Sequence, residues 1–209
     1  MLTSQRDDSM ETRRIAAKVH GRYLVVRGGG ERLIVGFHGY GENAERHLKE
    51  IEKLPGIDRW SVVAVQALHP FYNVKTGEVI ANWMTSQDRE QAIEDNLAYV
   101  GSILNALPKP RTLLFAGFSQ GAAMAYRAAA HFHCDGLLIL GGDLPPDVAS
   151  ARLPPILLGR GKTDDWYTDE KLNKDLSFLK GDVTTCVFDG GHEWSDAYRE
   201  AAGKFLARW

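Results

Sequence analysis

The sequence predicts an α/β fold in which a mostly parallel, twisted sheet is covered by helices on both faces. Short, nearly continuous apolar runs of strand length recur along the chain, and such runs are typical of parallel strands buried on both faces. Segments with apolar residues at helical spacing separate these runs, as expected when helices join the strands. A chain of 209 residues fits one domain, so we expect a single domain over residues 15–209 after a flexible tail at residues 1–14.

The first half of the chain is expected to open with a hairpin and to end in a long loop. The hairpin would pair strands at 15–19 and 22–26 around His20-Gly21. The segment after residue 66 lacks clear periodicity, which is typical of a loop. The other expected elements are a turn at 28–30, a strand at 32–37, a helix at 43–54, a strand at 61–66 and the loop at 67–87.

The second half alternates helices and strands more regularly. One apolar face runs along residues 88–107 and predicts a helix that Pro108 ends. Between the expected strands at 136–140 and 155–158 there is no room for a helical lid, so we expect an open site without a lid domain. The remaining expected elements are strands at 111–117 and 183–188 and helices at 120–131, 168–179 and 195–207.

Composition and charge exclude several classes of protein. Hydrophobic residues make up 44% and charged residues 25% of the chain, as in ordinary globular proteins. A formal net charge of −2 gives no electrostatic reason to expect nucleic acid as a partner, and no apolar run is long enough for membrane insertion. The polar residues 1–14 lack a signal-like apolar region, so a cytoplasmic protein is expected. Cys134 and Cys186 have no metal-binding spacing and are expected to be buried, reduced thiols.

The strongest chemical signal is a serine flanked by glycines at a predicted strand-to-helix turn, in Gly117-Phe118-Ser119-Gln120-Gly121. A sharp turn of this kind presents a serine hydroxyl as a nucleophile and leaves no space for a Cβ atom at the flanking glycines. The pentapeptide alone is common by chance. The rest of the chain must therefore supply a base, an acid and donors for an oxyanion.

Two positions after Ser119 meet the requirements for the base and the acid. A serine hydroxyl needs a base, and the base needs an orienting acid. His192 follows the last predicted strand and Asp164 follows the preceding one, so both should lie at the same edge of the sheet. Asp143 and Asp165 are the alternatives for the orienting acid.

The oxyanion donors are expected from two backbone amides. One is the N–H of Gln120, directly after the nucleophile. The second is the N–H of Tyr40, in the loop His38-Gly39-Tyr40-Gly41 that follows the strand at 32–37. His38 itself is expected to brace this loop through hydrogen bonds and not to act as a base.

These pieces together resemble the phospholipase/carboxylesterase family of α/β hydrolases, which includes acyl-protein thioesterases and small bacterial carboxylesterases. The resemblance covers essentially the whole chain and implies the α/β-hydrolase fold with Ser119, Asp164 and His192 as the catalytic triad. It departs at residues 161–168, where family members carry an aliphatic-rich run and this chain has DDWYT. That difference concerns the acyl-binding pocket. The matching motifs, in chain order, are HGYG, Asn82-Trp83-Met84, GFSQGAAMA, GxxDxxY at 161–167 and GGHEW.

The predicted activity is hydrolysis of carboxylic ester or thioester bonds in small, apolar substrates through an acyl-enzyme. No metal or organic cofactor is expected, because HExxH, phosphate-binding and dinucleotide-binding motifs all fail. The alternatives are a non-catalytic binding protein of the same fold, or an amide or peptide hydrolase using the same triad. Aromatic residues in loops near the site are expected to line the substrate pocket: Phe71, Tyr72, Trp83, Trp166, Tyr167 and Trp194.

Overall fold

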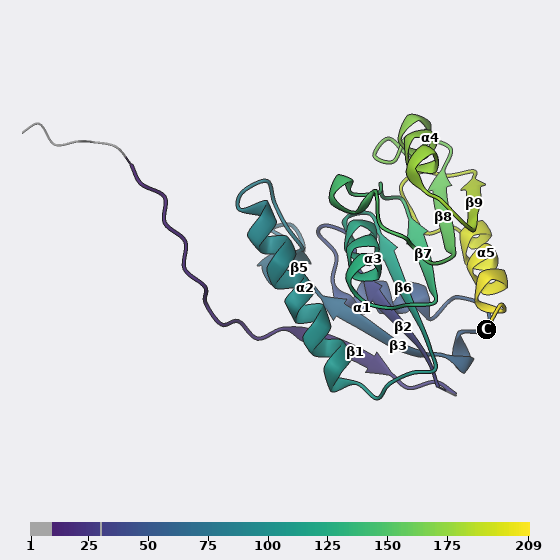
Figure 1. The fold of residues 1–209 in the computed structure, drawn as a ribbon, viewed down its shortest axis with the longest axis horizontal. Helices are drawn as coiled ribbons and strands as arrows, with labels where there is room; N and C mark the ends of the chain where they lie inside the picture. The colour runs from purple at the N-terminus through teal and green to yellow at the C-terminus, as the bar shows by residue number, and fades with distance from the viewer. Residues whose placement is uncertain (1–9, 30) are drawn as a thin grey trace, which may run out of the picture.

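The computed structural model describes residues 10–29 and 31–209, and its centre is a seven-stranded sheet with the strand order β1-β3-β2-β6-β7-β8-β9 (Figure 1). β1 runs antiparallel to β3, and every other neighbouring pair is parallel. The predicted, mostly parallel sheet is therefore confirmed. The strands are β1 Arg22–Val26, β2 Arg32–Phe37, β3 Ser61–Gln66, β6 Thr112–Phe118, β7 Gly136–Leu140, β8 Ile156–Gly161 and β9 Val183–Phe188.

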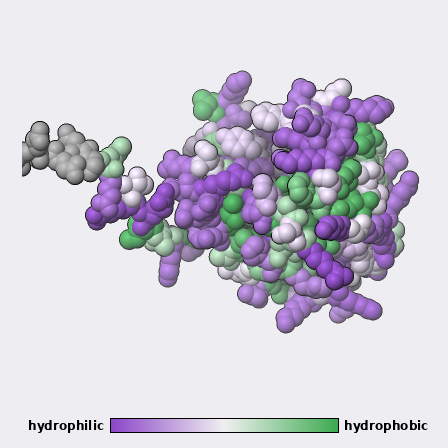
Figure 2. Space-filling model, turned by 45° about the horizontal axis from the view of Figure 1, so that its top comes forward, coloured by the Kyte–Doolittle hydropathy of each residue, from purple (hydrophilic) through white to green (hydrophobic). Residues whose placement is uncertain are grey.

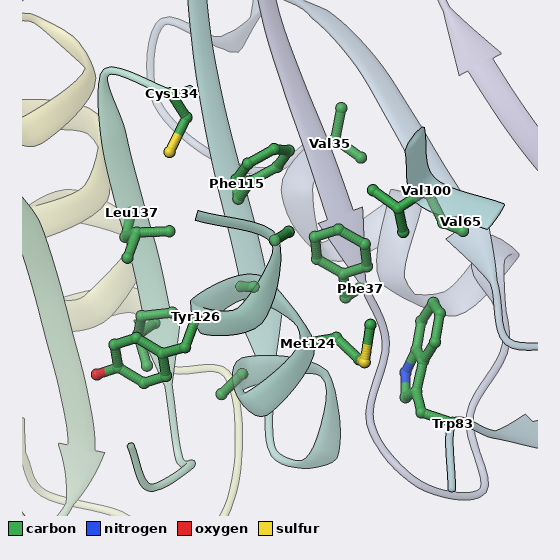
Figure 3. Packing of buried hydrophobic residues seen from close by; sticks show 14 of the residues in the cluster. Val35, Phe37, Val65, Trp83, Val100, Phe115, Met124, Tyr126, Cys134 and Leu137 are labelled. Atoms are coloured by element: carbon green, nitrogen blue, oxygen red, sulfur yellow. The ribbon is translucent and has the colours of Figure 1, made fainter. Parts of the chain in front are cut away.

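Helices cover both faces of the sheet. Successive residues of a strand point to opposite faces. In β2, Phe37 packs in the cluster that contains residues of α2, α3 and α4, whereas Ile34 packs in the cluster with α1 and α5. Figure 3 shows the first cluster, where Phe37, Phe115 and Met124 lie together. The helices are α1 Ala44–Ile51, α2 Arg89–Ala106, α3 Gln120–His131, α4 Asp169–Phe178 and α5 Asp196–Leu206.

Three helices begin at side-chain caps. Asn43 accepts the Arg46 N–H at the start of α1, and Thr168 and Ser195 do the same for α4 and α5. A cap residue has non-helical backbone, so each helix begins one residue after its predicted start. α1 also ends at Ile51, earlier than predicted, because residues 52–54 form a turn.

The predicted N-terminal hairpin is wrong. Residues 15–19 form no strand, and Ile15 and Val19 are exposed at 94% and 63%. β1 pairs instead with β3, where Tyr23 faces Val65. β3 offers β1 a partner that is distant in sequence, and this pairing overrides the local hairpin pattern. Residues 1–9 of the expected tail, and Gly30 of the expected turn, lie outside the described residues.

The predicted loop at 67–87 contains a second, two-stranded sheet. β4 His69–Tyr72 pairs antiparallel with β5 Val79–Asn82. Its connecting turn closes through Gly77, which has φ 70° and donates its N–H to the Asn73 carbonyl. The short strands, with a proline in β4, gave too weak an alternation to be predicted.

β8 is longer than the predicted strand at 155–158. Gly159, Arg160 and Gly161 continue the pairing with β9. An added Cβ atom would lie 2.3 Å from the Tyr198 ring at Gly159 and 2.2 Å from the Gly191 carbonyl oxygen at Gly161. Neighbouring atoms therefore leave no space for a Cβ atom at either position, which explains why these two strand residues are glycines.

The surface is mostly hydrophilic in the view of Figure 2, with hydrophobic residues in patches between the charged ones. None of the helices in the described part of the chain is long and apolar enough to cross a bilayer. Both cysteines are free thiols. Cys134 is buried as expected, whereas Cys186 is only partly buried because it lies on the edge strand β9.

Candidate active site

Ser119 lies at the turn between β6 and α3 in a strained backbone conformation. Its φ of 54° and ψ of −120° are rare for a residue with a side chain. Such strain costs about 1–3 kcal/mol and persists only where the surroundings enforce it. Two backbone hydrogen bonds do so here: the Ser119 N–H donates to the Leu140 carbonyl, and the Ala122 N–H donates to the Ser119 carbonyl, both at 2.9 Å.

Glycines on three segments make room for this turn. An added Cβ atom at Gly117 would lie 2.3 Å from the Gly121 carbonyl oxygen, and one at Gly121 would lie 1.9 Å from the Phe37 carbonyl oxygen. These contacts explain the two glycines of the pentapeptide. Gly142 has the same property, because its Cβ would lie 2.4 Å from the Ser119 carbonyl oxygen.

The side chains of Ser119, His192 and Asp164 form a continuous hydrogen-bonded relay. His192 Nε2 lies 2.8 Å from Ser119 Oγ, and His192 Nδ1 lies 2.8 Å from Asp164 Oδ2. A carboxylate accepts, so Nδ1 carries the proton and Nε2 is left to accept the serine proton. The arrangement can therefore move a proton away from Ser119.

Asp164 is the acid that contacts His192. Its side chain is fully buried, and its second oxygen accepts the backbone N–H groups of Trp166 and Tyr167, both at 2.8 Å. The two alternatives are placed differently. Asp143 faces Lys171 at 3.7 Å, and within the described residues Asp165 makes no side-chain hydrogen bond.

The loops that carry Asp164 and His192 are tied together. The Thr163 N–H and hydroxyl both donate to the Gly190 carbonyl, at 3.0 and 2.9 Å. The imidazole also packs against the Phe118 ring, with centroids 4.9 Å apart. Gly141, at φ 62°, allows the chain to pass beside the ring, since its Cβ would lie 3.0 Å from His192 Cε1. The imidazole is thus held on several sides.

The two expected oxyanion donors are both without acceptors in the described part of the chain. The segment from Gly39 to Glu42 is a turn closed by the Glu42 N–H and the Gly39 carbonyl at 3.2 Å, with Gly41 at φ 70°. This leaves the Tyr40 N–H outside the turn's hydrogen bond. The Gln120 N–H is one of the free donors of the first turn of α3.

His38 braces this loop from inside. Its Nε2 accepts the Ala67 N–H at 3.1 Å, so its Nδ1 must carry the proton that it donates to the Gly39 carbonyl at 2.7 Å. Burial lowers the pKa of His38 to about 4, which keeps the ring neutral at pH 7. These contacts are those of a structural histidine, as its position in the sequence predicts.

Several solved structures share this architecture. Acyl-protein thioesterase 2 of Zea mays superposes with a TM-score of 0.73 at 24% identity, covering 90% of this chain and 99% of that chain. The carboxylesterase of Bacillus cereus gives 0.71 at 15% identity, covering 90% and 94%. A phospholipase/carboxylesterase of Dyadobacter fermentans gives 0.69 at 18% identity, covering 92% and 99%.

The chain has the α/β-hydrolase fold. No family model matches the chain, and no curated protein matches it. Because the identities are low, these structures establish the fold but not the activity. The activity is inferred from the geometry of the site.

Within this α/β-hydrolase fold, Trp83 and Gln120 connect the nucleophile turn to the oxyanion loop. The Trp83 indole N–H donates to the His38 carbonyl at 2.8 Å, and the Trp83 backbone N–H donates to Gln120 Oε1 at 2.9 Å. Gln120 Nε2 in turn donates to the Met84 carbonyl at 2.8 Å. The sequence pointed to the Gln120 backbone but not to the role of its side chain.

Two of the six aromatic residues expected to line the pocket are buried in the core instead. Trp83 and Tyr167 are 0% and 1% exposed, so neither offers surface to a substrate. Trp83 belongs to the core seen in Figure 3, and the Tyr167 hydroxyl donates to Asp175. Both rings pack in the hydrophobic core, so their burial depends on long-range contacts that the local sequence does not show.

The other four aromatics retain exposed surface. Tyr72 and Trp166 are 70% and 74% exposed, and Phe71 lies 6.0 Å from the Tyr40 ring. Trp194 is half-buried, 6.1 Å from the Phe118 ring. These side chains remain candidates for contacts with a substrate.

A groove of about 600 Å³ lies against His192. Phe118 and Trp194 form part of its wall, but most of its lining residues are charged, including Arg46 and Glu50 of α1 and Lys53 just after it. This side of the site is therefore more polar than the aromatic residues alone predict. In the described part of the chain, no group of three or more His, Cys, Asp or Glu side chains is placed to hold a metal ion.

Proposed function

We propose that this protein is a serine hydrolase that cleaves carboxylic ester or thioester bonds of small, apolar substrates through an acyl-enzyme. The observation that carries the proposal is the relay from Ser119 Oγ through His192 to the buried Asp164, with both hydrogen bonds at 2.8 Å. The strained serine backbone adds to it, since strain of this kind persists where function requires it.

The proposed reaction begins with attack of Ser119 Oγ on the carbonyl carbon. His192 Nε2 takes the serine proton, while Asp164 holds the imidazole in the required tautomer and stabilises the imidazolium. The Tyr40 and Gln120 N–H groups bind the oxyanion. When the tetrahedral intermediate collapses, His192 gives the proton to the leaving oxygen or sulfur. Water then attacks the acyl-enzyme, with His192 as base, and releases the acid.

The substrate class is supported by the neighbouring structures and by the rim. The solved structures with this fold are named as an acyl-protein thioesterase, a carboxylesterase and a phospholipase/carboxylesterase. The Tyr40 and Phe71 rings lie together beside the proposed oxyanion loop and favour an apolar group on the substrate. A cytoplasmic location and the absence of nucleic-acid partners stay predictions from the sequence.

A fluorophosphonate probe and a short p-nitrophenyl ester test the proposal together. The wild-type protein should be labelled at Ser119 and should hydrolyse p-nitrophenyl butyrate. Ser119→Ala should lose both the labelling and the hydrolysis. Ser102→Ala, at an exposed position on α2, should retain both. A wild-type protein that is neither labelled nor active would instead indicate a binding protein of this fold. Hydrolysis of anilides in preference to esters would indicate an amide hydrolase.

A further inference from the structure

Glu42 lies at the junction of the oxyanion loop and the groove beside His192. Its carboxylate oxygen Oε2 accepts the Gly39 N–H at 2.8 Å, and its backbone N–H closes the turn onto the Gly39 carbonyl. Both the side chain and the backbone of Glu42 therefore hold Gly39. The same carboxyl group lines the groove together with His192.

The turn is also anchored from outside. The Gly41 N–H donates to the Ala81 carbonyl at 3.0 Å, and the Ala81 N–H donates to the Glu42 carbonyl at 2.8 Å. The backbone of Glu42 is thus held by β5, independently of the contact between its side chain and Gly39. Among the three N–H groups of Gly39, Tyr40 and Gly41, only that of Tyr40 has no acceptor in the described part of the chain.

The Glu42 carboxyl group is partly buried and has charged neighbours. Burial raises the pKa of Glu42, while the Gly39 N–H and the charges of Arg46 and His192 act against this and favour the ionised carboxylate; Glu50 acts in the same direction as burial. Arg46 is paired with Glu78, and Glu50 is paired with Lys53 and Arg199.

Two other acidic groups face His192. Asp164 holds Nδ1 from the β8 side, as described above. Glu193 is the next residue along the chain and lines the same groove, where its carboxylate accepts the Gly191 N–H at 3.1 Å. Neither contacts the oxyanion loop. Of these three carboxylates, Glu42 is the one that holds the oxyanion loop.

We propose that Glu42 is a positioning residue for acyl transfer: its carboxylate holds the Gly39 N–H so that the Tyr40 N–H is left for the oxyanion. This role rests on the proposed function. Glutamine can keep the acceptor for the Gly39 N–H, whereas alanine removes it.

The test is the steady-state kinetics of p-nitrophenyl butyrate hydrolysis in the wild-type protein, Glu42→Gln and Glu42→Ala. Glu42→Ala should lower kcat/KM by about 10- to 100-fold with little change in KM, since displacing an oxyanion donor weakens binding of the transition state and not of the substrate. Glu42→Gln should stay within about threefold of wild type, because the acceptor remains. Glu94→Gln, at an exposed residue of α2, should leave both constants unchanged.

Two results would overturn the proposal: Glu42→Ala with wild-type kcat/KM, or Glu42→Gln as impaired as Glu42→Ala. If Glu42→Ala does not fold, as judged by thermal denaturation, Glu42→Met, which keeps the length of the side chain without the acceptor, takes its place. Fluorophosphonate labelling separates the two levels of failure. A wild-type protein that is labelled and active, with unaffected Glu42 variants, removes only the role of Glu42; a wild-type protein that is neither labelled nor active removes the hydrolase function with it.

Discussion

Gly142 packs directly against the backbone of Ser119, 23 positions earlier in the chain. A Cβ atom at Gly142 would lie 2.4 Å from the Ser119 carbonyl oxygen and 2.5 Å from the Ala122 Cβ. The same carbonyl accepts the Ala122 N–H, and the Ser119 N–H is held by Leu140. The end of β7 and the residues after it therefore hold the strained serine, through the Leu140 carbonyl and the close approach of Gly142.

Gly142→Ala should consequently disturb both folding and reactivity. We expect the free energy of unfolding to fall by about 1–3 kcal/mol, as for an overpacked interior. Labelling of Ser119 by a fluorophosphonate should slow by about tenfold or more, because small displacements of a nucleophile are costly. Gly29→Ala is the matched control, since its Cβ would lie 3.7 Å from the Asp58 carbonyl oxygen. Urea unfolding and labelling rates measure both effects, and an unaffected Gly142→Ala variant would contradict this account of the turn.

Asp164→Asn should inactivate the site while leaving the fold nearly intact. The amide can present an N–H to His192 Nδ1, which favours the tautomer with the proton on Nε2, and that nitrogen could no longer accept the serine proton. We expect kcat for p-nitrophenyl butyrate to fall by about 10³–10⁴-fold. Asp165→Asn should keep wild-type kcat, because in the described part of the chain the imidazole is hydrogen-bonded to Asp164 and not to Asp165. If the Asp165 variant lost the activity instead, the orienting acid would have been misassigned.

The relay residues could be predicted from the sequence because each follows a strand whose burial is visible in its composition. β6, β8 and β9 end at the same edge of the sheet, so order along the chain was enough to place Ser119, Asp164 and His192 together. Gly142 could not be predicted in this way. Its reason is a contact with Ser119 that exists only after β6 and β7 have paired.

The errors have the same physical origin. Trp83 and Tyr167 occur in segments without clear periodicity, and their sequence neighbours do not reveal that both rings turn into the core. The pairing of β1 with β3 likewise depends on residues about 40 positions apart in sequence, and the local pattern at 15–26 favoured a hairpin. The local sequence pattern therefore predicted the elements between β6 and α5 well, but it predicted the long-range contacts poorly.

Acid should destabilise the protein through two buried, neutral histidines. Burial lowers the pKa of His38 to about 4 and that of His47 to about 3, from an ordinary value near 6.5. Between these values the unfolded chain binds more protons than the folded one, so stability falls as the pH drops below 6.5. The two groups together give a slope of about 2.5 kcal/mol per pH unit near pH 5. The raised pKa values of Glu42 and Asp175 act in the opposite sense.

Urea unfolding at pH 7 and pH 5 tests this contribution when it is repeated with His47→Leu. The variant lacks one of the two titrating rings, so the difference in unfolding free energy between the two pH values should shrink by about 2 kcal/mol, which is the contribution of a ring whose pKa is about 3 in the folded state. His133→Leu is the control, because its side chain is 92% exposed. Equal pH dependence in His47→Leu and the wild-type protein would show that His47 does not remain neutral in the folded state.

Trp83→Phe should weaken the oxyanion loop through the loss of one hydrogen bond. The indole N–H donates to the His38 carbonyl, and without it this buried carbonyl loses a partner at a cost of about 1–3 kcal/mol. Because His38 begins the loop that carries Tyr40, we also expect kcat to fall by about tenfold with little change in KM. Trp60→Phe provides a matched control, since Trp60 is equally buried but its indole N–H has no acceptor among the described residues. Both variants lose similar packing, so the difference between them in kcat measures the hydrogen bond. Equal kcat values in the two variants would mean that the bond from Trp83 to His38 does not position the oxyanion loop.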